Sequence, residues 1–450
     1  MVLRRNIYEN LESWKSRSNR KPLIIRGARQ VGKTTLLMNF SETYKYRIIL
    51  NLELESDLLH FNKFSEVKPL LESLFISRNI SVSSLNETLL FIDEIQESPK
   101  AIQMLRYIYE EFPGLHVIAA GSLLEFAMKK VKSFPVGRVE FLYLNPLNFP
   151  EFLEAIGHQT ALKHLNITPC DPTAHITLLA QFNQYAIIGG MPEIVSNYIK
   201  NNSITDLPAV YESIWSTYKS DVGKYASNDT DRKVITHVIS LAHLYLDQRI
   251  KFQNFGQSNY RSREVGEAFR SLDAAKIIQL IYPTTDVTVP AKPDLKKAPR
   301  MQFLDTGLVN HELGIQSDML AFSDLSSSYR GNIIPHLISQ ELISLNTIKD
   351  KKPVFWVRDK KQSSAEVDIV YSFKDKLIPI EIKSGKTGTL KSLHQFIEYC
   401  GHPYAVRFYG GEFGILKTKT PGGIPYLLMN LPYYLGTKLP EYIDYFISNY

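Results

Sequence analysis

The sequence has little cysteine and no long apolar run. Its two cysteines, Cys170 and Cys400, form neither a CxxC pair nor a disulfide framework, so we expect a reducing compartment and packing roles for both. Charge or proline interrupts every apolar stretch before the roughly 18 residues that a membrane span needs. Arg4 and Arg5 precede polar residues rather than an apolar segment, so we expect no secretion signal. These absences predict a soluble, cytoplasmic protein that makes no membrane contact.

A strong charge of either sign is also absent. The 52 basic and 46 acidic residues leave a formal net charge of +6, which permits nucleic acid as a partner without requiring it. At about 100–200 residues per domain, a chain of this length indicates two to four domains. We find no internal repeat and no extended low-complexity tract.

In residues 1–145, β-rich runs alternate with helical patterns. This alternation predicts an α/β domain in which helices cover a parallel sheet. The expected strands are Pro22–Arg26, Arg47–Leu52, Thr88–Ile92, His116–Ala120 and Val139–Leu144.

Three further segments follow. Residues 146–230 carry helical runs interrupted by the turn Gly189 to Pro192, which suggests a helical lid. In residues 231–322, helices precede strand-like runs at Lys276–Tyr282 and Arg300–Phe303, an order that suggests a winged helix. After the serine-rich patch Ser323 to Ser328, residues 323–450 are expected to form a second α/β domain. Its expected elements are a helix at Ile333–Leu345 and strands at Val354–Val357, Glu366–Tyr371 and Leu377–Ile382.

A phosphate-binding loop is predicted between the first strand and the helix that follows it. Gly27-Ala28-Arg29-Gln30-Val31-Gly32-Lys33-Thr34, followed by Thr35, fits G-x-x-x-x-G-K-[ST] in the strand–loop–helix order that the motif requires. Backbone N–H groups and the helix N-terminus would point at the phosphates of ATP. We expect Lys33 to neutralise the β- and γ-phosphates and Thr34 to ligate Mg²⁺.

A second motif would complete this site. Leu89 to Glu94 is an apolar strand that ends in two acids, at the sheet edge where the loop also lies. Asp93 suits Mg²⁺, and Glu94 suits the general base that polarises the attacking water. The alternative is that Glu94 only places a charge at a helix N-terminus.

Two further residues are candidates for contact with the γ-phosphate. Ser122 follows the strand ending at Ala120 and either senses the γ-phosphate or caps the next helix. Arg138 either stabilises the transferring phosphoryl group, in its own subunit or across an interface, or is solvated or paired with an acid.

Together these motifs resemble the AAA-type P-loop ATPases of bacteria and archaea, related to the archaeal-type and STAND ATPases, which carry a C-terminal domain of unknown function. Further matching pieces are Gly137-Arg138, Pro146 to Phe149, Gly189-Gly190-Met191-Pro192 and Phe303 to Leu308. The resemblance implies a RecA-like core, a helical lid, a winged-helix segment and a nuclease-like end.

The last domain looks like the D…ExK core of PD-(D/E)XK nucleases, which have a restriction-endonuclease-like α/β fold. Asp368 lies in one strand-like run, and Glu381 and Lys383 share a face of the next. Asp368 and Glu381 would hold Mg²⁺ while Lys383 orients water or stabilises charge. By the same resemblance Glu341 is a further ligand. Related folds also persist as inactive scaffolds, and buried carboxylates without metal should then show one raised pKa.

A basic surface is also predicted on the winged-helix segment. Such a surface would grip DNA phosphates, or it is a solvated face or a protein-docking module. Its residues are Arg261, Arg263, Arg270, Lys292, Lys296, Lys297 and Arg300.

Two hypotheses result. In the first, ATP hydrolysis controls a nuclease-like domain that acts on DNA. In the second, the chain is an ATP-driven switch or adaptor whose C-terminal domain is a silent binding module. A ring-forming homo-oligomer is a third possibility, and it depends on Arg138 reaching the nucleotide of a neighbour.

Overall fold

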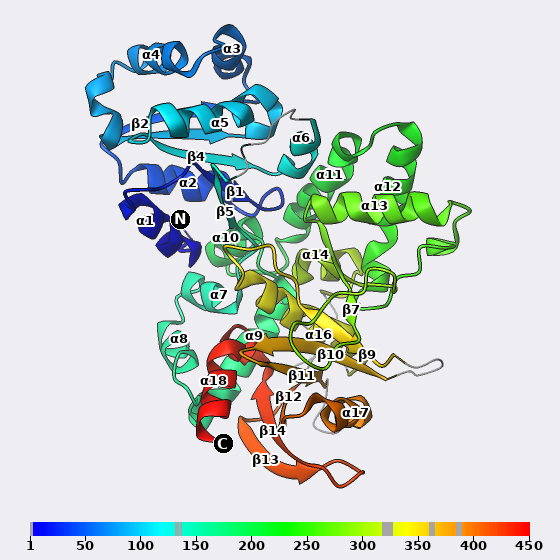
Figure 1. The fold of residues 1–450 in the computed structure, drawn as a ribbon. Helices are drawn as coiled ribbons and strands as arrows, with labels where there is room; N and C mark the ends of the chain where they lie inside the picture. Colours follow the sequence, from blue (N-terminus) through cyan, green and yellow to red (C-terminus); the bar gives the residue numbers. More distant parts are fainter. Residues whose placement is uncertain (1–2, 131–134, 136, 317–326, 360–364, 384–388) are drawn as a thin grey trace.

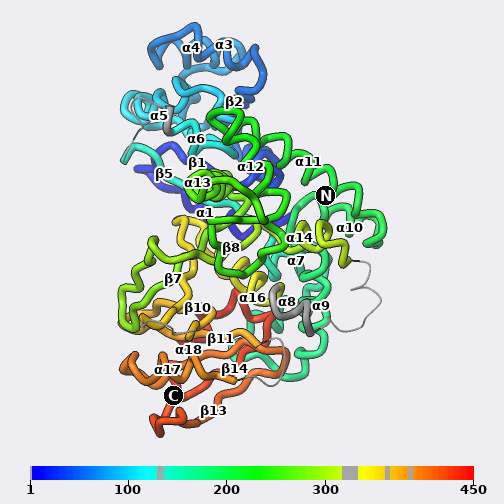
Figure 2. The backbone as a smooth tube through the Cα atoms, turned by 90° about the vertical axis from the view of Figure 1, so that its right-hand side faces the viewer, coloured from blue at the N-terminus to red at the C-terminus, as the bar shows by residue number. Residues whose placement is uncertain are grey.

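In the computed structural model, two α/β parts lie at opposite ends of the molecule and helices connect them (Figure 1). A view turned by 90° keeps this order (Figure 2). The structure describes residues 3–130, 135, 137–316, 327–359, 365–383 and 389–450. The expected domain boundary after residue 322 lies outside these ranges. None of the helices in the described ranges is both long and apolar enough to cross a membrane.

The N-terminal part is a five-stranded parallel sheet in the order β2-β3-β4-β1-β5. All five expected strands are present, which confirms the predicted α/β core. The fully buried strands β3 and β4 lie inside the sheet, as expected for apolar runs in a parallel sheet. The elements are α1 (Ile7–Ser16), β1 (Leu23–Arg26), α2 (Lys33–Ser41), β2 (Tyr46–Asn51), α3 (Glu55–Lys63), α4 (Val67–Ser77), the 3₁₀ helix η1 (Val82–Glu87), β3 (Thr88–Asp93), the 3₁₀ helix η2 (Ile95–Glu97), α5 (Pro99–Glu111), β4 (His116–Gly121), α6 (Leu124–Lys130) and β5 (Glu140–Tyr143).

Side-chain alternation along the strands gives this sheet two apolar faces. Ile24 and Ile92 belong to the core formed with α4 and α5, whereas Ile25 and Phe91 belong to the core that contains α1 and α2. The second of these cores continues through the middle helices into the C-terminal part, where it includes Ile378. The two ends of the molecule are therefore joined by continuous apolar packing.

The middle of the chain is helical, as predicted, and contains one antiparallel strand pair, β6 with β8. Arg249 adds an isolated bridge to Arg300 of β8. The order of helices followed by an antiparallel strand pair is the order that the winged-helix prediction requires. The winged helix itself stays a prediction. The elements are α7 (Phe149–Ala155), α8 (Gln159–Leu165), η3 (Pro172–Ala174), α9 (His175–Ile188), α10 (Pro192–Asn201), α11 (Pro208–Tyr225), α12 (Asp229–Leu241), η4 (Ala242–Tyr245), η5 (Phe255–Gln257), α13 (Ser262–Ala274), β6 (Ile278–Ile281), β7 (Pro283–Thr284), β8 (Arg300–Phe303) and α14 (Thr306–Glu312).

The C-terminal part is a seven-stranded mixed sheet in the order β13-β14-β12-β11-β10-β9-β7. Its edge strand β7 comes from the connection between β6 and β8 and pairs in parallel with β9. The winged-helix-like segment therefore shares a strand with this sheet, and the four domain boundaries stay predictions. The elements are α16 (Ser327–Ser344), β9 (Val354–Val357), β10 (Glu366–Phe373), β11 (Lys376–Ile382), α17 (Lys391–Cys400), β12 (Tyr404–Tyr409), β13 (Gly414–Lys419), β14 (Pro425–Pro432), η6 (Tyr433–Lys438) and α18 (Leu439–Asn449).

Three motifs that lie far apart in the sequence meet in a buried junction below the N-terminal sheet. The carboxylate of Asp305 accepts hydrogen bonds from the backbone N–H groups of Gly190 (2.6 Å) and Leu308 (3.2 Å). Gly190 also accepts a backbone hydrogen bond from Leu147, at 2.7 Å. A Cβ atom at Gly190 would lie 2.0 Å from the carbonyl oxygen of Leu147, so this approach requires glycine. The junction fixes where the helical lid begins.

Candidate functional site

The loop after β1 has the shape that phosphate binding requires. Gly27 and Gly32 have φ values of 156° and 92°, conformations that glycine adopts at little cost. A Cβ atom at Gly27 would lie 2.2 Å from the carbonyl oxygen of Leu144. Helix α2 begins at Lys33, so its unpaired N–H groups face the loop and provide a site for an anion.

Lys33 is buried, and its amine donates to the carbonyl oxygens of Gly27 (3.0 Å) and Ala28 (2.8 Å). Burial lowers the pKa of Lys33 to about 8, although Glu94 and Asp93 oppose this shift. An arriving phosphate would replace the two carbonyls as partner of the amine and favour its charged form. Lys33 is therefore placed to bind phosphate without moving far.

The hydroxyl of Thr34 donates to Asp93 Oδ2 at 2.7 Å. Burial raises the pKa of Asp93, so this carboxylate gains from a cation nearby. Two hard oxygen donors that face each other at the end of a phosphate loop fit Mg²⁺. When bound, the ion would neutralise phosphate charge, and Thr34 and Asp93 would hold it.

Glu94 follows β3 with a φ of 50° and lines a cleft of about 610 Å³ together with Lys33 and Thr34. The left-handed backbone turns its side chain out of the strand direction. Pro192 and Glu193 of α10 also line this cleft. The structure thus brings Lys33, Thr34, Asp93 and Glu94 together.

Arg29 and Gln30 contribute backbone to the loop, but the side chain of Arg29 points elsewhere. Its guanidinium donates to both carboxylate oxygens of Asp221 in α11, each at 2.9 Å, and to Glu53 Oε1 at 2.9 Å. The hydroxyl of Tyr218 donates to the Arg29 carbonyl at 2.9 Å. The nucleotide loop is therefore tied directly to α11.

Ser122 lies at the end of β4, where the γ-phosphate prediction places it. Its hydroxyl is buried and has no hydrogen-bond partner in the part of the chain that the structure describes. It does not cap α6 in this conformation, and its contact with the γ-phosphate stays a prediction.

Arg138 lies at the other edge of the sheet. Glu140 of β5 pairs with Leu23, the first residue of β1, whereas the phosphate loop follows the last residue of β1. Arg138 instead contacts Glu110 at 2.9 Å. It does not approach the nucleotide site of its own chain, which corrects the prediction of a role there, and only a role in a neighbouring subunit stays a prediction.

Arg5, for which the sequence predicts no functional role, is buried behind the loop. Its guanidinium donates to the carbonyls of Val31 (3.1 Å) and Asn145 (2.5 Å) and pairs with Glu151 at 3.2 Å. Arg5 thus fixes the loop to the segment that enters the lid. No local pattern announces this role, because the partners of Arg5 are mostly backbone carbonyls far along the chain.

In the C-terminal part, Asp368 and Glu381 lie on the paired strands β10 and β11. Lys383 contacts Glu381 Oε1 at 2.5 Å, and the backbone N–H of Ile382 donates to Asp368 Oδ2 at 2.8 Å. Burial, and then Asp368, raises the pKa of Glu381 to about 7. The predicted residue types do meet here.

Arg300 of β8 lies where a metal ion was expected. Its guanidinium contacts Glu366 Oε1 at 2.7 Å, Asp368 Oδ1 at 3.3 Å and Asp247 Oδ1 at 3.7 Å. Burial would lower the pKa of Arg300, but these three carboxylates together raise it. No group of three His, Cys, Asp or Glu side chains within the described ranges could hold a metal ion. With Arg300 in place, the carboxylates do not fit Mg²⁺.

Arg300 is therefore not part of the predicted basic surface, because it is buried among acids. Within that surface, Arg270 pairs with Glu267 at 2.8 Å and Lys297 pairs with Asp359 at 3.3 Å. Arg261, Arg263, Lys292 and Lys296 are exposed. The surface available for phosphates is smaller than the sequence suggested.

Glu341 does not join the C-terminal carboxylates, which corrects its prediction as a metal ligand. It is fully buried at the junction, where it accepts from the backbone N–H of Phe149 at 3.1 Å and lies 2.9 Å from the hydroxyl of Tyr185. That hydroxyl also lies 2.8 Å from the carbonyl oxygen of Leu147. One hydroxyl proton cannot serve both acceptors, so a protonated Glu341 that donates to Tyr185 completes the network.

Burial raises the pKa of Glu341 from 4.5 to about 8. Because the folded state keeps a proton that the unfolded state releases, Glu341 makes its full contribution to stability below pH 4.5, and this contribution is lost as the pH rises toward 8. The loss is at most about 1.4 kcal/mol per pH unit. We expect Glu341→Gln, which stays neutral, to remove this decline.

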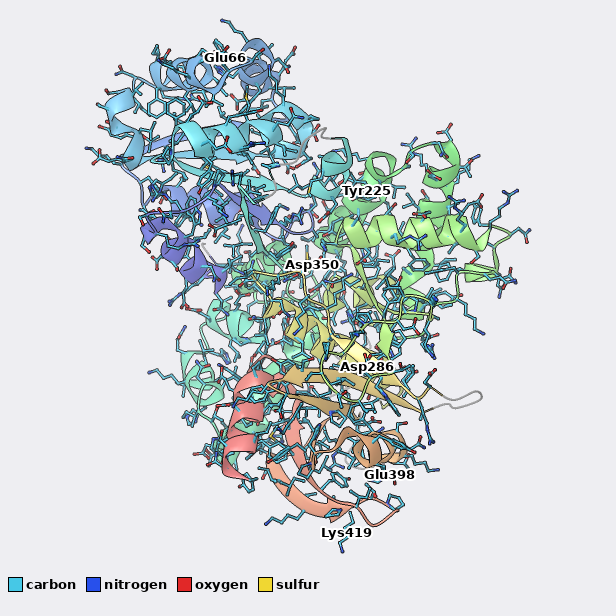
Figure 3. All side chains as sticks on the ribbon, in the orientation of Figure 1. Glu66, Tyr225, Asp286, Asp350, Glu398 and Lys419 are labelled. Carbon is cyan, nitrogen blue, oxygen red and sulfur yellow. The ribbon has the colours of Figure 1, made fainter. Side chains whose placement is uncertain are left out.

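Urea unfolding of both chains between pH 5 and pH 8 measures the effect of Glu341→Gln. The difference in free energy of unfolding should grow in favour of the glutamine variant as the pH rises. Glu398→Gln, at an exposed position of α17 labelled in Figure 3, is the control and should run parallel to the unmodified chain. Parallel curves for Glu341→Gln as well would contradict a neutral Glu341.

Family models match three parts of the chain. Residues 19–153 match an AAA domain, whereas residues 179–319 and 330–422 match two domains of unknown function, DUF8612 and DUF4143. No curated protein matches the chain. Together with the geometry of the loop, the first match defines residues 19–153 as an AAA domain of the P-loop ATPase class.

Solved structures resemble the chain only distantly. A Walker-type ATPase of Pyrococcus abyssi is 16% identical with a TM-score of 0.44, and the match covers 70% of this chain and 96% of that one. A STAND protein with a tetratricopeptide repeat sensor from Pyrococcus horikoshii is 12% identical with a TM-score of 0.25, covering 74% and 45%. The S. cerevisiae Hsp104–ADP complex is 12% identical with a TM-score of 0.27, covering 60% and 38%.

Proposed function

We propose that this chain is an ATP-hydrolysing switch, in which the nucleotide bound at the P-loop controls the position of the C-terminal domain. The observation that carries the proposal is the meeting of Lys33, Thr34, Asp93 and Glu94 around one cleft. In hydrolysis, Glu94 takes a proton from water, whose oxygen then attacks the γ-phosphorus as the bond to ADP breaks. Lys33 binds the phosphate oxygens as this charge shifts.

Contacts between the nucleotide loop and the helical part support the control of one domain by the other. Arg29 of the loop holds Asp221 of α11, and a Cβ atom at Gly32 would lie 3.5 Å from Cγ of Pro192 in the lid. At the end of α11, the ring of Tyr225, labelled in Figure 3, stacks on Phe126 of α6 at 5.5 Å. A change in the conformation of the loop on ATP binding is therefore transmitted to α10 and α11 through these contacts.

From there the route to the C-terminal domain runs through the junction. Asp305 contacts Gly190 in the turn before α10, and Glu341 of α16 contacts Phe149 of α7. Both contacts are buried, so a shift of the lid requires a matching shift of α16.

The test compares hydrogen exchange of the C-terminal sheet in the presence of ATP and of ADP. We expect ATP and ADP to give different protection from hydrogen exchange in β9 to β11. In Asp221→Asn, the fractional loss of this difference, relative to the unmodified chain, should exceed the fractional loss of ATP turnover. Glu53→Gln removes the other, more exposed partner of Arg29 and is the control. Identical protection with ATP and ADP in the unmodified chain would overturn the proposed control.

A metal-dependent nuclease that acts on DNA is the second candidate. Asp368, Glu381 and Lys383 on adjacent strands favour it, but it requires Arg300 to leave the carboxylates. Cleavage of linear, branched or single-stranded DNA with Mg²⁺ or Mn²⁺, lost in Asp368→Ala and Lys383→Ala, would establish this activity. Absence of cleavage alongside ATP turnover leaves the C-terminal domain as a binding module.

A homo-oligomer also stays a proposal, because Arg138 is exposed and could reach the nucleotide of a neighbouring subunit.

A further inference from the structure

The side chain of Gln96 lies between Glu94 and the end of β4. Its amide nitrogen donates to Glu94 Oε2 at 2.5 Å. Its amide oxygen is buried and has no hydrogen-bond partner within the described ranges. Gln96 belongs to the short helix η2, which begins directly after Glu94. Sequence analysis assigned no role to this residue.

Gly121 leaves the space that Gln96 uses. A Cβ atom at Gly121 would lie 2.4 Å from Gln96 Oε1, while the next atoms, Cδ of Gln96 and Cγ2 of Ile95, would lie at 3.5 Å and 3.6 Å. Gly121 ends β4 and pairs with Arg26, the residue before the phosphate loop. The Gln96 side chain therefore fits against the strand end that adjoins the nucleotide cleft.

We propose that Gln96 is the positioning residue of Glu94 in ATP hydrolysis, an inference that rests on the proposed function. The amide holds one carboxylate oxygen of Glu94, which leaves the other oxygen to accept the proton of the attacking water. A glutamate held in one rotamer loses less entropy on reaching the productive geometry. Loss of this hydrogen bond leaves the phosphate contacts unchanged, because Lys33 and the loop provide them. Glu94 then meets the attacking water less often in the right orientation.

The experiment uses the full chain and two substitutions at Gln96. Gln96→Met keeps the length of the side chain but removes the amide group that donates the hydrogen bond. Gln96→Ala removes both the amide group and most of the side chain. We expect each to lower kcat by about 10- to 100-fold, in line with the cost of misplacing a catalytic group, with little change in the Kd for a fluorescent ATP analogue. A residue that only fills space would behave differently, because Gln96→Met would then retain the unmodified kcat.

Gly121→Ala gives an independent test, because its methyl group displaces the Gln96 side chain while the residue itself is unchanged. Among the described residues, only the flexible end of the Gln96 side chain would lie within 3.0 Å of this methyl group, so the fold should tolerate the change. We expect a similar loss of kcat, and the double variant Gly121→Ala/Gln96→Ala should lose no more than Gln96→Ala alone. Additive losses would overturn the proposed contact.

Failure of this inference can be told apart from failure of the proposed function. If the unmodified chain binds ATP but does not hydrolyse it, the proposed function and this inference both fall. If the unmodified chain hydrolyses ATP, Glu94→Gln abolishes turnover and Gln96→Met does not lower kcat, only the role of Gln96 falls.

Discussion

Replacing Glu94 by glutamine is expected to lower ATP turnover by about 10²- to 10⁴-fold while ATP stays bound, because a general base contributes that much to the rate. Glutamine keeps the shape of the side chain and the contacts around the cleft but cannot accept the proton of the attacking water. The phosphate contacts of Lys33 and of the loop are unchanged, so affinity should be retained or improved. Turnover of ATP and binding of a fluorescent ATP analogue, measured on the same preparation, separate the two effects.

Lys33→Ala is the matched control for this result. It removes the buried amine that faces the loop, so both ATP binding and turnover should be lost. Equal hydrolysis by the unmodified chain and by Glu94→Gln would contradict the role of Glu94. The alternative, a charge at a helix N-terminus, would then be favoured.

Replacing Arg300 by leucine is expected to destabilise the chain by about 3–5 kcal/mol, the usual cost of leaving buried charges without their partner. Asp247, Glu366 and Asp368 all contact this guanidinium, which also lies over the ring of Phe355 at 4.7 Å. Burial raises the pKa of Asp247 to about 7 even with Arg300 present. Denaturant unfolding at neutral pH measures the loss.

The neighbouring Arg249 provides the control for Arg300. It lies 3.9 Å from Glu366 and is more exposed, so Arg249→Leu should cost less than about 1 kcal/mol. If Arg300→Leu lowered the free energy of unfolding as little as Arg249→Leu, the proposed importance of the Arg300 ion pairs would be contradicted. Added Mg²⁺ distinguishes the two candidate functions, because stabilisation of the unmodified chain would show that Arg300 can leave the carboxylates and would favour the nuclease, whereas stabilisation of Arg300→Leu alone would favour the switch.

The N-terminal fold and its site could be predicted because their signals are local. Buried parallel strands are continuous apolar runs such as Leu89 to Ile92, and the loop from Gly27 to Thr34 contains its own expected phosphate-binding groups. The order of the strands in the sheet is not part of this local signal. Asp93 and Glu94 could be placed beside the loop because parallel strands end at one edge.

The C-terminal site could not be predicted in full because its decisive contacts join distant residues. Arg300 is one of several basic residues of the segment that predict a basic surface, and no local pattern shows that three acids surround it. Glu341 was misplaced for a related reason. The helix was predicted correctly, but its sequence does not specify that residue 341 faces α7 rather than the sheet.

The pairing of β7 with β9 constrains the order in which the chain reaches its final form during synthesis. Residues 283–284 leave the ribosome between β6 and β8, yet their hydrogen-bonding partner lies at residues 354–357. The N-terminal sheet has all its strands by residue 143 and can form early, as N-terminal domains generally do. Residues 283–284 must instead stay without their strand partner until β9 has been made. The contact of β7 with β9 can therefore form only after synthesis has passed residues 354–357.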